Sequence, residues 1–167
     1  DFSKVDKAQV AVASGPTFGA SWNGVGYVAG EVWNDNSTFV GDSSGTWTYT
    51  SLSGAFTSGV QYRVKSRGVD KALNTEASFV TGTNQNTFLY DAAAPVSTVT
   101  VPAPGALVRN LPTLSGTGAD KPDGPLLRAG LDKVEVQVTS QVPAGAAISY
   151  WQGASWSTSV VTWLVAT

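Results

Sequence analysis

The sequence contains no histidine, no cysteine and no methionine among its 167 residues. The lack of cysteine excludes disulfide bonds and cysteine-bound metals. Without histidine or cysteine, the Ser-His and Cys-His nucleophile pairs are excluded as well, together with histidine-ligated metal sites. A cysteine-free composition suits a long exported chain, which could otherwise form wrong disulfides in an oxidising compartment.

Charged residues are also scarce, at 13% of the chain, against roughly 25% in ordinary globular proteins. The net charge is −2 and the isoelectric point is about 4.9, so there is no basic patch for nucleic acid. No run of 18 or more apolar residues is present, and we expect no membrane insertion within this segment. Hydrophobic residues make up 42% of the chain, which is sufficient for a packed core rather than disorder.

One stretch of the sequence occurs twice. Residues 6–12 (Asp-Lys-Ala-Gln-Val-Ala-Val) return as residues 132–138 (Asp-Lys-Val-Glu-Val-Gln-Val), a shift of 126 positions. A tryptophan and then a Thr-Trp pair follow each copy; these are Trp33 and Trp151, then Thr46-Trp47 and Thr162-Trp163. The chain is therefore predicted to be a stretch of a tandem array, slightly longer than one repeat.

Alternation with a period of two dominates the chain, which is the pattern of half-buried β-strands. It occurs in both copies of the repeat and in residues 60–64. No segment carries a helical stripe, and the 18 glycines and eight prolines argue against long helices. Many short strands separated by turn residues predict an all-β chain built as β-sandwich modules in tandem.

The repeat also predicts the domain boundaries. Residues 90–95 (Tyr-Asp-Ala-Ala-Ala-Pro) form a linker, which gives modules at 1–91 and 92–167. The first module lacks a counterpart of residues 92–130, its first strands, and the second lacks a counterpart of residues 52–91, its last strands. Each module is thus expected to be incomplete within this chain, with an unpaired strand edge and a bare apolar face. The strands expected in the second module are 96–101, 113–118, 131–139 and 160–166.

Three motifs occur in an order that resembles bacterial immunoglobulin-like or fibronectin-III-like surface repeats. They are Tyr62-x-Val64-x-Ser66-Arg67-x-x-Asp70-x-Ala72-x-Asn74, the linker Tyr90-Asp91-x-x-x-Pro95, and Leu114-x-Gly116-Thr117-x-Ala119-Asp120. The resemblance implies an immunoglobulin-like sandwich, a role in large adhesins, surface layers or filaments, and no catalytic residues. It also implies that Tyr62 is a corner tyrosine whose hydroxyl bonds the backbone.

One position departs from this pattern. The glycine that precedes the final Asn of the motif is replaced by Leu73. Glycine there would allow a positive φ in the hairpin turn. We expect the positive φ to move to Asn74, because asparagine tolerates it better than leucine.

Aromatic residues are the main candidates for sites. The residues that recur, or that carry the resemblance, are expected in the core; these are Trp33, Trp47, Tyr62, Trp151 and Trp163. The others could contact a ligand such as a glycan, or a neighbouring subunit; these are Trp22, Tyr27, Phe18 and Trp156. The alternative for the group around Trp22 is that its glycine-rich segment folds back over the end of the sandwich.

Asp120 and Asp123 share a loop and form a candidate calcium site, since calcium prefers oxygen ligands. Aspartates in Gly/Pro loops more often close Asx turns, which is the alternative here. No other cofactor is expected. The acidic residues lie in turns or on the polar faces of strands, so no enzyme is predicted.

These features predict a structural or adhesive repeat segment that acts as a stalk, spacer or filament building block. Its expected location is the extracellular space or the cell surface of a prokaryote. Its expected partners are neighbouring repeats or copies of the same protein. The alternative function is a carbohydrate- or surface-binding module that uses the aromatic residues around Trp22.

Overall fold

The computed structural model describes residues 4–36, 38–121, 127–143 and 145–167. All regular secondary structure in these residues is β, so the prediction of an all-β chain is confirmed. In the same residues no helix is long and apolar enough to cross a membrane. Residue contacts divide the chain into two units, and the main division falls between Ala93 and Ala94. Residues 127–129 belong to the first unit, where Leu127 N donates to Gly59 O (3.1 Å).

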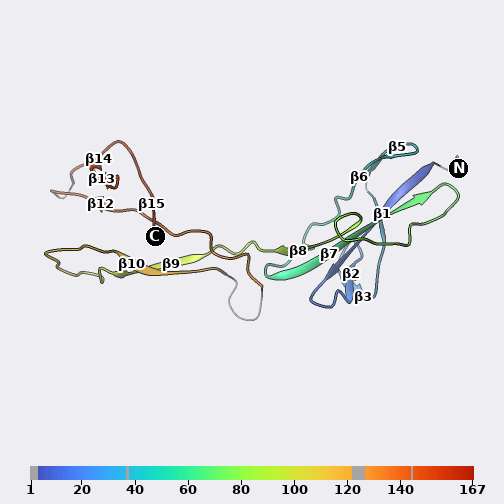
Figure 1. The fold of residues 1–167 in the computed structure, drawn as a ribbon, viewed down its shortest axis with the longest axis horizontal. Helices are drawn as coiled ribbons and strands as arrows, with labels where there is room; N and C mark the ends of the chain where they lie inside the picture. The colour runs from blue at the N-terminus through green and yellow to red at the C-terminus, as the bar shows by residue number, and fades with distance from the viewer. Residues whose placement is uncertain (1–3, 37, 122–126, 144) are drawn as a thin grey trace. The chain divides into compact units, whose positions relative to one another are not determined.

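The first unit contains a sheet with the strand order β3-β2-β1-β7-β8, in which β4 also pairs with β1 (Figure 1). A separate antiparallel hairpin is formed by β5 and β6. The strands of this unit are β1 (Val5–Ser14), β2 (Ala20–Trp22), β3 (Tyr27–Ala29), β4 (Asn34–Asp35), β5 (Thr38–Gly41), β6 (Gly45–Thr48), β7 (Val60–Asp70) and β8 (Gln85–Tyr90).

The pairing of β1 with β7 is the longest in the chain. It runs antiparallel from Val5↔Asp70 to Ser14↔Tyr62, with one irregularity near the start. The first copy of the repeat lies inside β1, and its alternating residues Ala8, Val10 and Val12 are all buried. The repeated sequence therefore forms the central strand of the sheet because small and aliphatic side chains suit a strand covered on its inner face.

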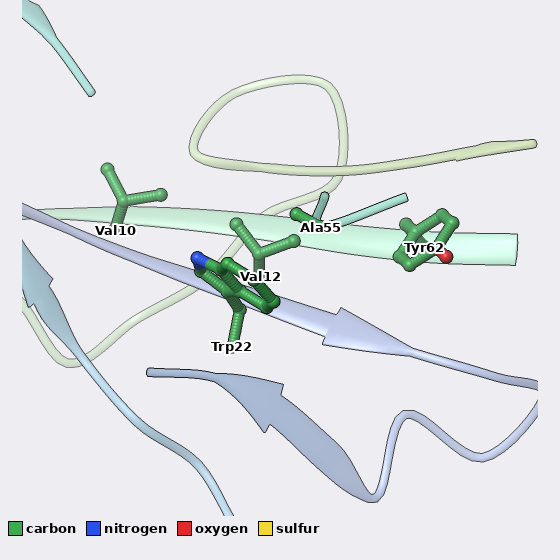
Figure 2. Packing of buried hydrophobic residues seen from close by; sticks show 5 residues of the cluster. All are labelled: Val10, Val12, Trp22, Ala55 and Tyr62. Carbon is green, nitrogen blue, oxygen red and sulfur yellow. The ribbon is translucent and has the colours of Figure 1, made fainter. Parts of the chain in front are cut away.

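The core of the first unit is centred on β1, β2 and β7. Figure 2 shows its fully buried members, which are Val10, Val12, Trp22, Ala55 and Tyr62. Aromatic rings of β8 and of the loop before β7 extend this cluster through edge, tilted and stacked contacts; these are Phe56, Phe88 and Tyr90. Rings in such arrangements add stability beyond the area that they bury.

The turn after β7 corrects the prediction for Leu73. Leu73 itself adopts a φ of 69°, and Asn74 does not take over the positive value. The side chain of Asp70 explains this, because its two oxygens accept hydrogen bonds from Asn74 N and Asn74 Nδ2, both at 2.8 Å. The backbone N of Leu73 also donates to Asp70 O (2.9 Å). This network fixes Asn74, so the left-handed conformation is confined to an exposed leucine.

The second unit consists of small antiparallel sheets. These pair β9 with β10, β11 with β15, and β13 with both β12 and β14. Its strands are β9 (Val96–Val101), β10 (Ser115–Ala119), β11 (Glu135–Val136), β12 (Thr139–Ser140), β13 (Ser149–Trp151), β14 (Trp156–Ser157) and β15 (Leu164–Val165). The expected strands at 131–139 and 160–166 are thus much shorter than predicted. No described side chain of this unit is fully buried.

Candidate functional site

Trp22 does not form a ligand site, although the sequence made it a candidate. It ends β2, is only 4% exposed, and its Nε1 donates to Ser51 O at 2.8 Å. Its ring lies 5.4 Å from that of Tyr27. The segment forms strands β2 and β3 of the sheet itself, and the indole is buried there with its N–H satisfied, which is strongly favourable.

Tyr27 and Phe18 are likewise occupied within the first unit. Burial, with a smaller effect of Tyr62, raises the pKa of the Tyr27 hydroxyl to about 12. That hydroxyl is buried and has no hydrogen-bond partner among the described residues. Phe18 lies under the guanidinium of Arg63, with 4.7 Å between Arg63 Cζ and the ring centroid. Both rings therefore make contacts within the first unit.

The four recurring tryptophans are less buried than predicted. Trp47 is 38% exposed and Trp163 is 58% exposed, so the expectation that they lie in the core is corrected. Trp47 lies on β6, which pairs only with β5 among the described strands. Trp33 and Trp151 are half-buried. Tyr62 is 1% exposed and lies in the core.

Trp156, the remaining candidate for ligand contact, lies in the second unit on β14. It is 48% exposed, and its ring is 5.4 Å from that of Trp151, directly opposite on β13. The pair is a cross-strand aromatic contact of the kind that stabilises a short hairpin. One face of this pair remains accessible to solvent.

Asp120, one half of the proposed calcium site, uses its carboxylate to hold the backbone. Its Oδ1 accepts from Lys121 N (2.9 Å) and its Oδ2 from Gly130 N (2.6 Å). Asp123 lies outside the described residues. No three acidic side chains of the described residues come close enough to hold a metal ion. The Asp120 carboxylate therefore joins the backbone at Lys121 to that at Gly130, and neither bond is the one to the residue two positions on that defines an Asx turn.

A row of cations on β7 was not singled out from the sequence. Arg63, Lys65 and Arg67 alternate, so they leave the sheet on the face opposite Tyr62 and Val64. Each cation is covered by an aromatic ring, at 4.7 Å from Phe18, 4.6 Å from Phe79 and 4.1 Å from Trp33 respectively. The alternation Arg-x-Lys-x-Arg is visible in the sequence and could have indicated a row of cations on one face. The rings that cover these cations come from distant segments, so the contacts themselves were not predictable.

This cation–aromatic row is also neutralised in part. Lys65 Nζ lies 2.8 Å from Glu31 Oε1, and the hydrogen bond from Lys65 lowers the pKa of the Glu31 carboxyl. Arg67 Nε donates to Gln9 Oε1 at 2.8 Å. Cation–π contacts of this kind are worth about 0.5–1 kcal/mol each at exposed sites. The row therefore stabilises the outer face of the sheet rather than presenting free cations to a partner.

A groove with a volume of about 410 Å³ lies in the second unit. Its apolar lining comes from β9, the second copy of the repeat and the residues just before β10 and β15; it consists of Val99, Leu114, Val134, Val136 and Trp163. Where β10 crosses the repeat, a Cβ at Gly118 would lie only 2.7 Å from side-chain atoms of Leu131 and Val134. The β9–β10 hairpin thus packs on one end of the repeat, while the rest of the apolar face stays open.

Comparison of the chain with family models, with curated proteins and with solved structures finds no match. The immunoglobulin-like resemblance therefore stays a prediction, and the function has to be argued from the residues and the geometry described above.

Proposed function

We propose that this chain is a structural segment of a tandem β-repeat array, acting as a stalk, spacer or filament building block outside a prokaryotic cell. The observation that carries the proposal is the placement of the repeated sequence. Its first copy is the central strand of the main sheet, and its second copy holds β11. A repeat that supplies the same structural element in successive units is the pattern of an array whose length grows with copy number.

The surface chemistry supports a structural role. The three cations of the cation–aromatic row are covered by rings, and Lys65 is also paired with a carboxylate. The described residues contain no cluster of acidic side chains that could hold a metal. The aromatic residue on which the carbohydrate-binding alternative rested, Trp22, is buried. What remains open is apolar surface and strand edge, which suit contacts between repeats.

The proposal is tested by lengthening the array in register. Residues 6–131 form one period, so chains carrying one, two or three copies of 6–131 followed by 132–167 are in-frame arrays. We expect the maximum dimension from small-angle X-ray scattering to rise by an equal increment with each copy. A dimension that grows only as the cube root of chain length would indicate collapse into a globule and would contradict a stalk.

The rival function is tested with glycans. A structural segment is expected to show no saturable binding to a panel of soluble and insoluble polysaccharides. Saturable binding that is abolished by Trp156→Ala but kept by Trp47→Ala would instead support a binding module that uses the exposed pair in the second unit.

A further inference from the structure

We infer that the open edge of the second unit is an acceptor for a pair of antiparallel strands of the β7–β8 type, supplied by the next stretch of the same tandem array. The acceptor consists of residues 132–138 together with the groove beside them. This inference rests on the proposed function and names the partner of this acceptor surface in the second unit.

The edge that is already paired matches the first unit position by position. In the first unit, β1 pairs with β4 at Gln9↔Asp35 and Val10↔Asn34. In the second unit, β11 pairs with β15 at Glu135↔Val165 and Val136↔Leu164. Residues 135 and 136 are the repeat equivalents of 9 and 10, at the shift of 126. β15 therefore takes the place of β4.

A backbone hydrogen bond outside the short ladder confirms this register. Asn36 N donates to Ala8 O at 2.9 Å in the first unit, and Ala166 N donates to Val134 O at 2.9 Å in the second. Val134 is the repeat equivalent of Ala8. The two units thus build the same edge with the same atoms of the repeated sequence.

The opposite edge differs between the units. In the first unit it is filled by β7, which pairs with β1 from Val5 to Ser14. In the second unit, no described strand pairs with that edge of residues 132–138. Backbone groups at alternate positions face it, and the alternation assigns Lys133, Glu135 and Gln137 to this side. Such an unpaired edge is a template for another strand.

The side chains define what the added strands must carry. In the first unit, Val10 and Val12 are 3% and 1% exposed because Tyr62, Val64, Phe88 and Tyr90 pack in the same cluster. All four of those residues lie on β7 or β8. Their equivalents in the second unit, Val136 and Val138, are only half-buried, and the nearby Trp163 is exposed. The groove therefore lacks the aromatic and aliphatic side chains that a β7–β8 pair brings.

A second copy of this chain is a poor source of those strands. Its own β7 is hydrogen-bonded to β1 along the whole strand and to β8 on the other side. Releasing these strands would expose the core of the donor's first unit. The stability lost there would offset the stability gained at the acceptor edge. The following stretch of an array has no such conflict, so the structure favours a donor in the same polypeptide.

The test is to extend the chain with its own sequence in register. β15 takes the place of β4 with Leu164 at the position of Asn34, a shift of 130, so Thr167 matches Ser37 and residues 38–91 are appended directly after Thr167. The matched control carries the same extension with serine in place of its copies of Tyr62, Val64, Phe88 and Tyr90. Both extended chains keep residues 1–167 unchanged, and amide exchange in the first unit reports on its folding.

With the intact extension, we expect the amides of residues 133, 135 and 137 to exchange at least 100-fold more slowly than in the unextended chain. In a parallel set of the three chains that carries phenylalanine at the other tryptophans, acrylamide quenching of Trp163 is expected to be lower with the intact extension than without it. The serine control is expected to behave like the unextended chain. Should the intact extension aggregate, a peptide of residues 38–91 added to the unextended chain is expected to give the same protection.

Three results would overturn the inference. Unchanged exchange at residues 133–137 with the intact extension, while the first unit stays folded, would show that the edge does not accept these strands. Protection that appears in the unextended monomer would show that the edge is already filled. Protection that appears only at high protein concentration, with a dimer in sedimentation, would assign the donor to a second copy. These results come from amide exchange and sedimentation, whereas the stalk function is tested by small-angle X-ray scattering. The strand-acceptor inference and the proposed function can therefore fail separately.

Discussion

The backbone N–H of Thr57 donates a 2.8 Å hydrogen bond to the hydroxyl of Tyr62. Tyr62 thereby joins the loop before β7 to the centre of the core. We expect Tyr62→Phe to lower the free energy of unfolding of the first unit by about 1–2 kcal/mol, because the Thr57 N–H loses its partner. Urea unfolding monitored by circular dichroism measures the change.

Tyr27 is the control for this prediction. Its hydroxyl is buried without a hydrogen-bond partner among the described residues, so Tyr27→Phe removes an unsatisfied group. That variant is expected to be neutral or slightly more stable than the parent. Equal losses from the two Tyr→Phe changes would contradict the assignment of the Tyr62 hydrogen bond.

Trp22 and Trp47 are expected to differ sharply in their energetic roles. Trp22→Ala should cost about 3–5 kcal/mol, as for other large-to-small changes in a core. Trp47→Ala, at an exposed ring of the same kind, should cost clearly less. Trp22→Phe retains the ring volume in part but removes the donor to Ser51 O, and it should fall between the two. Thermal or urea unfolding of the three variants checks this order.

Leu73 is a position where a glycine should stabilise the protein. A non-glycine residue at positive φ destabilises the folded chain by about 1–2 kcal/mol. Glycine avoids this strain, but it loses more conformational entropy on folding, which destabilises the folded chain by roughly 0.5–1 kcal/mol. The difference predicts that Leu73→Gly raises the free energy of unfolding by about 0.5–1 kcal/mol. Leu73→Ala keeps the Cβ and is expected to leave stability nearly unchanged. A loss of stability in the glycine variant would rule out strain at this turn.

The Glu31–Lys65 ion pair should contribute stability at neutral pH and lose it in acid. The pKa of Glu31 is lowered in the folded chain, first by the hydrogen bond from Lys65. Its contribution is therefore complete above the unfolded value of about 4.3 and is lost as the pH falls through the lowered folded value. The pair is partly exposed, with side chains 16% and 43% accessible for Lys65 and Glu31, so less than about 1 kcal/mol is expected.

A double-mutant cycle checks this prediction. Glu31→Gln is expected to destabilise the first unit at pH 7 and to approach the parent in acid, once the pH has fallen through the lowered pKa of Glu31 and both side chains are neutral. In a Lys65→Met background, the pH dependence of the Glu31→Gln effect should largely disappear. A Glu31→Gln effect that is the same at both pH values would show that the ion pair does not cause it.

Strands β1 and β7 could be expected from local pattern because their apolar and polar residues alternate along consecutive positions. The first repeat copy, residues 60–64 and Tyr62 all fell on β1 or β7 for that reason. The position of Trp22 could not be predicted in the same way. Its neighbours are glycine, serine and asparagine, which favour a loop, and only the contact with β1 and Ser51 O makes the segment a buried strand.

The cation–aromatic row and the exposure of Trp47 and Trp163 could not be predicted from sequence pattern alone either. The alternation of Arg63, Lys65 and Arg67 was visible, but the rings that cover them lie many positions away in sequence. Trp47 and Trp163 carry an apolar pattern that predicts burial, yet burial requires a facing layer. Sequence pattern specifies which face is apolar, whereas the tertiary arrangement decides whether anything covers it.

The antiparallel pairing of β1, β7 and β8 also determines how the first unit responds to mechanical tension. Val5 pairs with Asp70 at one end of β7, whereas Tyr90 pairs with Val60 at the other. The two points where the chain enters and leaves the sheet are therefore at opposite ends along the strand direction. A force that pulls them apart loads the β1–β7 hydrogen bonds in shear, so that they must break together rather than one after another. Because forced unfolding is governed by the unfolding barrier, this strand order makes the unit resist extension more than its equilibrium stability alone would suggest.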